Sequence, residues 1–77
     1  MWKVVTQPNC PFCVQVKELL KKEGIAYSEV DITHQDNYWV ISLMKSSGYT
    51  TVPQVFNERG RRVGGYMEVE NYVTQAV

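Results

Sequence analysis

Residues 2–32, WKVVTQPNCPFCVQVKELLKKEGIAYSEVDI, place two strand-like segments on either side of a helix-like one. Residues 2–6 are rich in β-branched and aromatic side chains, and residues 25–32 alternate apolar and polar side chains, as half-buried strands do. Between them, apolar side chains recur at spacings of three and four over residues 11–23, which is typical of an amphipathic helix, and Gly24 ends it. A strand, a helix and a second strand of these lengths predict a right-handed βαβ unit with parallel strands.

The rest of the chain adds two helices and a β-hairpin to this unit. Thr33 or Asp36 is expected to cap a helix that reaches Lys45. The elements predicted after it are strands over residues 53–56 and 61–63 around a loop at residues 57–60, a turn at Gly64-Gly65 and a helix from Met67. The order βαβαββα predicts an α/β sandwich in which helices cover a small mixed sheet.

The tryptophans and the hairpin arginines can be assigned to the interior or to the surface from their positions in the predicted elements. Trp2 and Trp39 lie in apolar-periodic elements, so both are expected to pack in the interior. The arginines of the hairpin are expected to form a solvated tip that protects an edge strand, with a docking patch for an acidic partner as the alternative. These arginines are Arg59, Arg61 and Arg62.

Length and charge bound the class of protein. The chain has 77 residues, 44% of them hydrophobic, and eight Lys plus Arg balance eight Asp plus Glu. A chain of this size supports one core, so residues 1–77 are expected to form a single domain. A neutral chain has no field to hold nucleic acid or an anionic membrane, and no apolar run approaches the roughly 20 residues that span a bilayer. The segment from Met1 turns polar too soon for a signal peptide, so we expect a cytoplasmic monomer.

The two cysteines of the chain, Cys10 and Cys13, are three residues apart. A disulfide that closes so short a loop suits formation and cleavage better than holding a fold. Cys10 falls where the first strand's loop enters the helix, so free N–H groups and the positive end of the helix dipole favour its thiolate. Cys13 lies one turn later and should be less exposed. We therefore predict Cys10 as the nucleophile and Cys13 as the resolving thiol.

The cysteine pair has two plainer interpretations. The two cysteines could be small core residues that happen to be three apart. They could instead be half of a zinc site, because Cys-x-x-Cys is a common zinc spacing and structural zinc takes four ligands. His34 is the one histidine of the chain and lies in a polar stretch, so we expect it on the surface and expect no metal.

Three motifs in order resemble the glutaredoxin family. They are Cys10-Pro11-Phe12-Cys13 after a strand, Thr51-Val52-Pro53-Gln54-Val55-Phe56 leading a late strand, and Gly64-Gly65-Tyr66 before the last helix. The resemblance covers nearly the whole chain. In its compactness the chain is similar to the short dithiol glutaredoxins of bacteria and their phages. The resemblance implies a thioredoxin-like sandwich whose four-stranded mixed sheet is flanked by three helices.

The resemblance also implies a site for glutathione, as a co-substrate, beside the cysteine pair. The family places a cis proline at the position of Pro53, which leaves the Val52 backbone free to pair with a bound peptide or glutathione. The alternatives are a trans proline that only starts an edge strand and a Gly64-Gly65 segment that is a plain turn. Glu68 keeps an acid for the γ-glutamyl amino group. The implied glutathione-binding residues are Gln7, Phe12, Thr51, Val52, Pro53, Gly65, Tyr66, Met67 and Glu68.

The activity implied is that of a glutathione-dependent thiol–disulfide oxidoreductase acting on protein disulfides and glutathione mixed disulfides, with ribonucleotide reductase as a candidate client. Gln7 stands where many members carry a lysine that attracts the glycyl carboxylate of glutathione. One alternative is therefore a thioredoxin-mimicking redoxin recharged by thioredoxin reductase. Another is an iron–sulfur carrier that uses Cys10 of two protomers and two glutathiones, against which Pro11 and Cys13 both argue.

Overall fold

A computed structural model describes residues 1–49 and 51–75 of the chain. Within these residues the order of elements is the predicted βαβαββα, with a short 3₁₀ turn before the second helix. The bounds are β1 Trp2–Thr6, α1 Pro11–Lys22, β2 Tyr27–Asp31, η1 Gln35–Asn37, α2 Tyr38–Ser46, β3 Gln54–Phe56, β4 Arg62–Gly64 and α3 Tyr66–Gln75.

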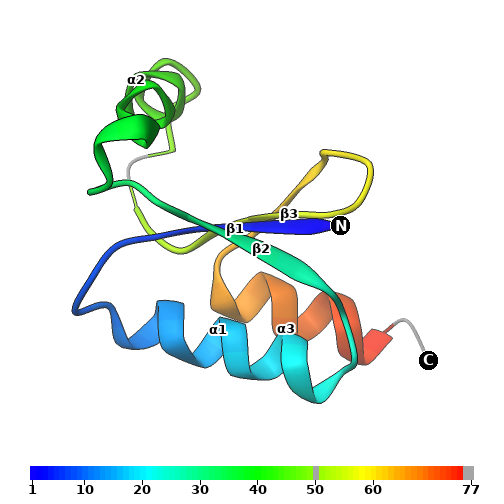
Figure 1. Cartoon of the computed structure of the whole chain (residues 1–77). Coiled ribbons are helices and arrows are strands. Elements are labelled where there is room, and N and C mark those ends of the chain that lie inside the picture. The colour runs from blue at the N-terminus through cyan, green and yellow to red at the C-terminus, as the bar shows by residue number, and fades with distance from the viewer. Residues whose placement is uncertain (50, 76–77) are drawn as a thin grey trace.

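The four strands form one mixed sheet in the order β2-β1-β3-β4. β1 pairs with β2 in parallel and with β3 antiparallel, and β3 pairs antiparallel with β4. Figure 1 shows α1 and α3 side by side on one face of the sheet, with α2 on the opposite side. The α/β sandwich with a parallel βαβ unit is therefore confirmed.

Each face of the sheet has its own core. Alternate side chains of β1 point to opposite faces, so Trp2 and Val4 pack under α1 and α3 while Val5 packs under α2. Leu20 of α1 is fully buried in the first cluster. The first cluster contains Trp2, Val4, Val16, Leu20, Val55, Val69 and Val73, and the second contains Val5, Val40 and Met44.

The start of β2 and the start of α2 differ from the prediction. The Ile25 N–H donates to the Leu20 carbonyl at 2.9 Å and closes the end of α1, so the β2 strand begins at Tyr27. Neither Thr33 nor Asp36 caps α2: the Thr33 N–H and hydroxyl both donate to Asp31, and Asp36 lies inside the 3₁₀ turn. The helix instead begins at Tyr38, after the 3₁₀ turn.

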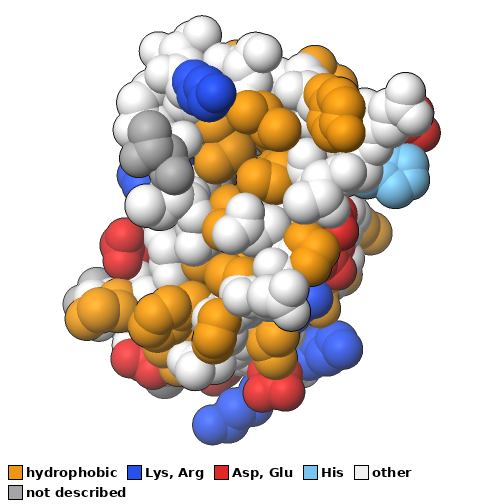
Figure 2. Space-filling view, turned by 90° about the vertical axis from the view of Figure 1, so that its left-hand side faces the viewer, with side chains coloured by type: hydrophobic (Ala, Val, Ile, Leu, Met, Phe, Trp, Pro, Cys, Tyr) orange, Lys and Arg blue, Asp and Glu red, His pale blue; other side chains and the backbone are white. Residues whose placement is uncertain are grey.

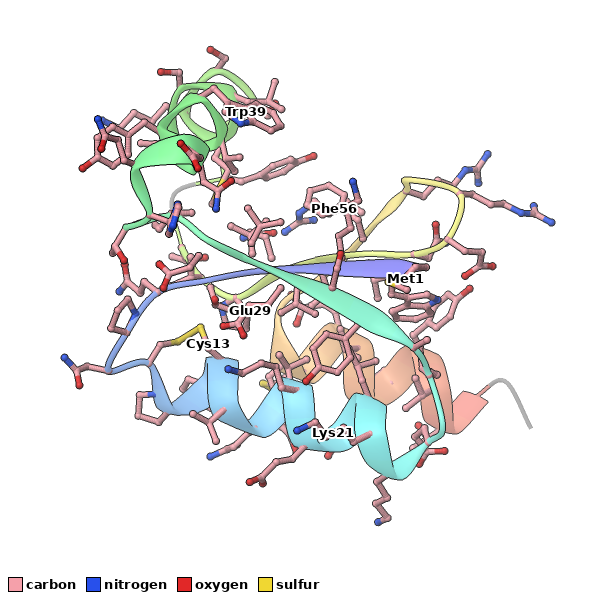
Figure 3. All side chains as sticks on the ribbon, in the orientation of Figure 1. Met1, Cys13, Lys21, Glu29, Trp39 and Phe56 are labelled. Carbon is pink, nitrogen blue, oxygen red and sulfur yellow. A yellow bond between two sulfur atoms is a disulfide. The ribbon has the colours of Figure 1, made fainter. Side chains whose placement is uncertain are left out.

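The predicted packing is right for Trp2 and wrong for Trp39. Trp2 is 7% exposed and donates its indole N–H to Glu58. Its ring packs edge-on against the ring of Tyr72, with the ring centroids 5.6 Å apart. Trp39 is 64% exposed, because α2 covers the sheet through the side chains of Val40 and Met44, which lie four residues apart on one stripe. Figure 3 shows Trp39 on α2, far from the α1 face.

Arg59, Arg61 and Arg62 are all exposed, as expected for a solvated hairpin tip, but Arg62 also makes two contacts that were not predicted. Its Nε donates to Gln54 Oε1 at 2.8 Å, and its guanidinium carbon lies 4.3 Å from the centre of the Tyr49 ring. Within residues 1–49 and 51–75, every helix is too short or too polar to be a membrane span.

Candidate active site

The cysteine pair lies where the chain passes from β1 into α1. Cys10 has extended dihedral angles, φ −114° and ψ 101°, and is the N-cap of the helix, with Pro11 in the first turn. Its sulfur accepts the Cys13 N–H at 3.1 Å, which satisfies one of the free donors at the helix start. A sulfur in this place meets the positive end of the helix dipole, as the sequence predicts.

Cys10 and Cys13 form a disulfide, with their Cα atoms 5.2 Å apart. Figure 3 shows the yellow bond at the start of α1, with Cys13 labelled. Cys13 is 2% exposed, whereas Cys10 is partly exposed. The predicted difference in exposure between the two sulfurs is therefore confirmed.

The loop before β3 brings backbone polar groups to the exposed sulfur. The Val52-Pro53 peptide bond is cis, as the resemblance implies. The Val52 carbonyl oxygen lies 4.0 Å from Cys10 Sγ. An extended partner placed over Cys10 would therefore meet the backbone of Val52, in the manner of an added strand.

Two hollows flank the disulfide and share Thr51 and Val52 as a common wall; we call them together the disulfide groove. The first, about 500 Å³, is lined by Gln7, Asn9, Cys10, Pro11, Ile32, Ile41, Met44, Lys45, Tyr49, Thr51 and Val52. The second, about 200 Å³, is lined by Phe12, Thr51, Val52, Pro53, Gly65, Tyr66, Met67 and Glu68. All the site residues predicted from the sequence line this groove except Cys13, which is buried.

One charged side chain lines each hollow. Lys45 borders the first, and Glu68 borders the second. Glu68 Oε1 also accepts the Gly65 N–H at 3.3 Å, so this carboxylate caps the first turn of α3 as the distal half of a capping box does. The groove therefore offers a cation and an anion on opposite sides of the Thr51–Val52 wall.

Aromatic and apolar side chains cover much of the rest of this face. The rings of Phe12 and Tyr66 lie 6.2 Å apart and bridge the starts of α1 and α3. Phe12 is 56% exposed and Met67 69%. The Tyr66 hydroxyl donates to Glu70 at 3.1 Å, and this hydrogen bond raises the pKa of the phenol. Figure 2 shows hydrophobic side chains in the middle of this face and charged groups mostly near its edges.

A hydrogen-bonded ion pair links β1, α1 and β2 on the same side of the sheet. Thr6, which is 1% exposed, donates its hydroxyl to Glu29 Oε2 at 2.6 Å, and Lys17 Nζ lies 3.1 Å from the same oxygen. The Thr6 hydrogen bond, followed by the Lys17 ammonium, lowers the pKa of Glu29 against the opposing effect of desolvation. Lys17 is one turn beyond Cys13, so this pair joins the active-site helix to the sheet.

Sequence reasoning missed part of the first hollow. Tyr49, Ile41 and Met44 line it although none was predicted for the site. The signal for Tyr49 was its place just ahead of the Thr51–Val52–Pro53 segment. Ile41 and Met44 carried no distinct signal, because apolar residues at helical spacing also predict an ordinary core face.

A cysteine pair at a helix start, beside a cis proline on a thioredoxin-like sheet, defines the class of thiol–disulfide oxidoreductases. The Glutaredoxin family profile matches residues 2–61. The chain belongs to the glutaredoxin family.

The relatives agree with this family. A hybrid peroxiredoxin of Haemophilus influenzae is 39% identical over 90% of the chain, which spans 27% of that relative's length. Glutaredoxin 1 of Rickettsia prowazekii is 34% identical over 88% of the chain and 72% of its own length. The crystal structure of a buckwheat glutaredoxin–glutathione complex superimposes with a TM-score of 0.83 at 26% identity, covering 97% of this chain and 69% of that one.

Proposed function

We propose that this domain reduces protein disulfides and glutathione mixed disulfides and is recharged by glutathione. The observation that carries the proposal is the partly exposed Cys10 at a helix start, above the buried Cys13 and beside the Val52 backbone. The similar buckwheat glutaredoxin, whose crystal structure is that of its complex with glutathione, supports glutathione as the small thiol.

The proposed cycle starts from the dithiol. The Cys10 thiolate attacks one sulfur of the client disulfide, forms a mixed disulfide and releases the client's other sulfur as a thiolate. Cys13 then loses its proton and attacks Cys10, which frees the second client sulfur and leaves the Cys10–Cys13 disulfide. Two glutathiones return the pair to the dithiol by two such exchanges and leave as glutathione disulfide, so the two electrons come from glutathione.

The charges of the disulfide groove match the two ends of glutathione. Lys45 borders the first hollow and would attract the glycyl carboxylate. It would take the role of the lysine that many glutaredoxins carry at the position of Gln7. Glu68 and the first turn of α3 border the second hollow, where they would receive the γ-glutamyl amino and carboxylate groups. The cysteinyl part would pair with Val52, which separates the two hollows.

The test is steady-state reduction of a glutathione mixed disulfide, with glutathione and its reductase as the electron source. We expect turnover by the wild type, none by Cys10→Ser, and retained turnover by Cys13→Ser, since deglutathionylation needs only one thiol. Reduction of a protein disulfide should need both cysteines. Full activity of Cys10→Ser in either assay would contradict the proposed function.

A second candidate is favoured by Gln7, which provides no charge in the first hollow. In this case thioredoxin reductase rather than glutathione recharges the Cys10–Cys13 disulfide. The rates of recharging by the two donors, measured on the same oxidised protein, discriminate between the candidates. A clear preference for thioredoxin reductase would replace glutathione in the proposal.

For the setting of this activity we propose a single-domain monomer in the cytoplasm, where thiols are kept reduced. Its clients are disulfide-bearing proteins, with ribonucleotide reductase as one candidate. The Haemophilus relative, named as a hybrid peroxiredoxin, adds peroxiredoxin disulfides as a second candidate. Trapping a mixed disulfide with Cys13→Ser and identifying the bound protein by mass spectrometry tests both.

A further inference from the structure

Gln54, the residue after the cis proline, is a buried polar side chain that contacts Thr51 in the wall of the disulfide groove and Arg62 of β4. It is 3% exposed. Its Nε2 donates to the Thr51 carbonyl at 2.9 Å, with the Thr51 hydroxyl at 3.4 Å, and its Oε1 accepts from Arg62 at 2.8 Å. A buried amide without partners is costly, so these contacts hold the side chain in one orientation.

The hydrogen bond to the Thr51 carbonyl acts on the Val52 N–H as well. The carbonyl of one residue and the N–H of the next belong to a single planar peptide unit, and in a trans unit they point in opposite directions. Gln54 is buried and holds the Thr51 oxygen on its own side of the peptide unit, so the Val52 N–H points away from Gln54. Val52 itself lines both hollows of the groove. The direction of this donor is therefore set by a side chain that does not line the groove.

Arg62 extends the same arrangement to a second part of the wall. It lies on β4, yet it donates to Gln54 and stacks its guanidinium on the Tyr49 ring at 4.3 Å. Tyr49 lines the first hollow together with Thr51. One arginine thus braces both the amide that orients the Thr51–Val52 unit and the aromatic ring next to it.

We propose that Gln54 and Arg62 are positioning residues, which hold the Thr51–Val52 peptide unit and the Tyr49 ring in the orientation that receives the backbone of a peptide-like disulfide. This inference rests on the proposed function, because it concerns how the same groove selects its disulfide. It distinguishes disulfides that carry a peptide backbone, such as glutathione disulfide, from small aromatic disulfides that offer no backbone to pair.

The experiment compares two disulfides on the reduced protein. The rate of reaction with glutathione disulfide depends on the groove wall, while the rate with dithiodipyridine reports the reactivity of the Cys10 thiolate alone. Gln54→Glu keeps an acceptor for Arg62 but removes the donor to Thr51. We expect it to slow the reaction with glutathione disulfide about tenfold, as for loss of a hydrogen bond worth about 1.4 kcal/mol. The rate with dithiodipyridine should stay within about twofold.

Further variants separate positioning from folding. Arg62→Met removes the brace but leaves the Thr51 contact, so we expect about a threefold loss with glutathione disulfide. Arg61→Met, an exposed neighbour on the same hairpin, is the matched control and should change neither rate. Circular dichroism and thermal unfolding check that each variant is folded.

The outcomes are distinct. Equal losses with both disulfides in a folded Gln54→Glu protein, or no loss with either, would overturn the positioning role while leaving the proposed function standing. A wild type that shows no turnover with glutathione overturns both. A selective loss in Gln54→Glu and Arg62→Met, with Arg61→Met unchanged, supports the proposal.

Discussion

Glu29 joins the sheet to the active-site helix through Thr6 and Lys17, and its carboxylate is stabilised in the charged form. A carboxyl whose pKa is lowered on folding contributes stability that is present above its ordinary value of 4.5 and is lost as the pH falls through the folded value. We expect Glu29→Gln to lower the free energy of unfolding at pH 7 by less than about 1 kcal/mol, because the pair is partly exposed.

Urea unfolding of wild type and Glu29→Gln at a series of pH values measures this effect. The difference between the two proteins should shrink as the pH drops below about 4.5. Glu18→Gln, at an exposed carboxylate of α1, is the matched control. A gap between wild type and Glu29→Gln that widens toward acid pH would contradict the assignment of the ion pair.

Lys45 and Gln7 test the charge of the first hollow. Lys45→Gln should raise the KM for a glutathione mixed disulfide about tenfold, since a charge-assisted contact is lost. Gln7→Lys adds a cation to the same hollow and should lower that KM. Both shifts should weaken as salt is added. Lys21→Gln, at the far end of α1, serves as the control. An equal rise in KM for Lys21→Gln would show that Lys45 has no specific role in binding glutathione.

At the scale of elements, the junction between β4 and α3 depends on Gly64. Its φ is +131°, and a Cβ placed there would lie 2.7 Å from the Cβ of Glu68, in the first turn of α3. Gly60 has φ +77° and open space around it, so alanine there meets only backbone strain. We expect Gly60→Ala to cost about 1 kcal/mol of unfolding free energy and Gly64→Ala about 2 kcal/mol or more.

Chemical denaturation of both alanine variants measures this difference. Gly64→Ala should also reduce activity, because displacing the first turn of α3 moves Tyr66 and Glu68 at the second hollow. Equal stability of the two variants would show that α3 adjusts without cost.

The elements that the sequence predicted well are those with local signals. β1 and α1 have their own period, their own cap and a glycine stop, so their bounds needed no tertiary information. Trp39 could not be placed, because the buried stripe of α2 depends on how the helix sits on the sheet. The contacts of the exposed Arg62 could likewise not be predicted, since its partners Gln54 and Tyr49 lie 8 and 13 positions away in the sequence.

For the molecule as a whole, the site lies apart from the start of β1 and the end of α3. Figure 1 shows that β1 begins, and α3 ends, at the end of the sheet opposite the start of α1. A further domain joined at either place would leave Cys10 and the disulfide groove open. This arrangement is compatible with the Haemophilus hybrid peroxiredoxin, of which the matching region is 27%.

The stability of the whole molecule should depend little on its redox state. The chain-entropy relation gives about 2 kcal/mol for a disulfide that closes four residues, and this figure is an upper bound. In the disulfide state Cys10 Sγ accepts the Cys13 N–H, and we expect a Cys10 thiolate at the positive end of α1 to keep this contact after reduction, which would offset part of that loss. The core side chains Val4, Leu20 and Val55 are fully buried, and none of them belongs to the disulfide.

We therefore expect the oxidised and reduced proteins to differ by no more than about 2 kcal/mol in urea unfolding at pH 7. Cys10→Ser, which cannot form the disulfide but keeps an N-cap side chain, should match the reduced wild type within about 1 kcal/mol and should not respond to dithiothreitol. A reduced protein that is unfolded at 25 °C would show that the disulfide is structural. The pair could not then cycle between its two states in a folded domain, and the proposed reaction would fail with it.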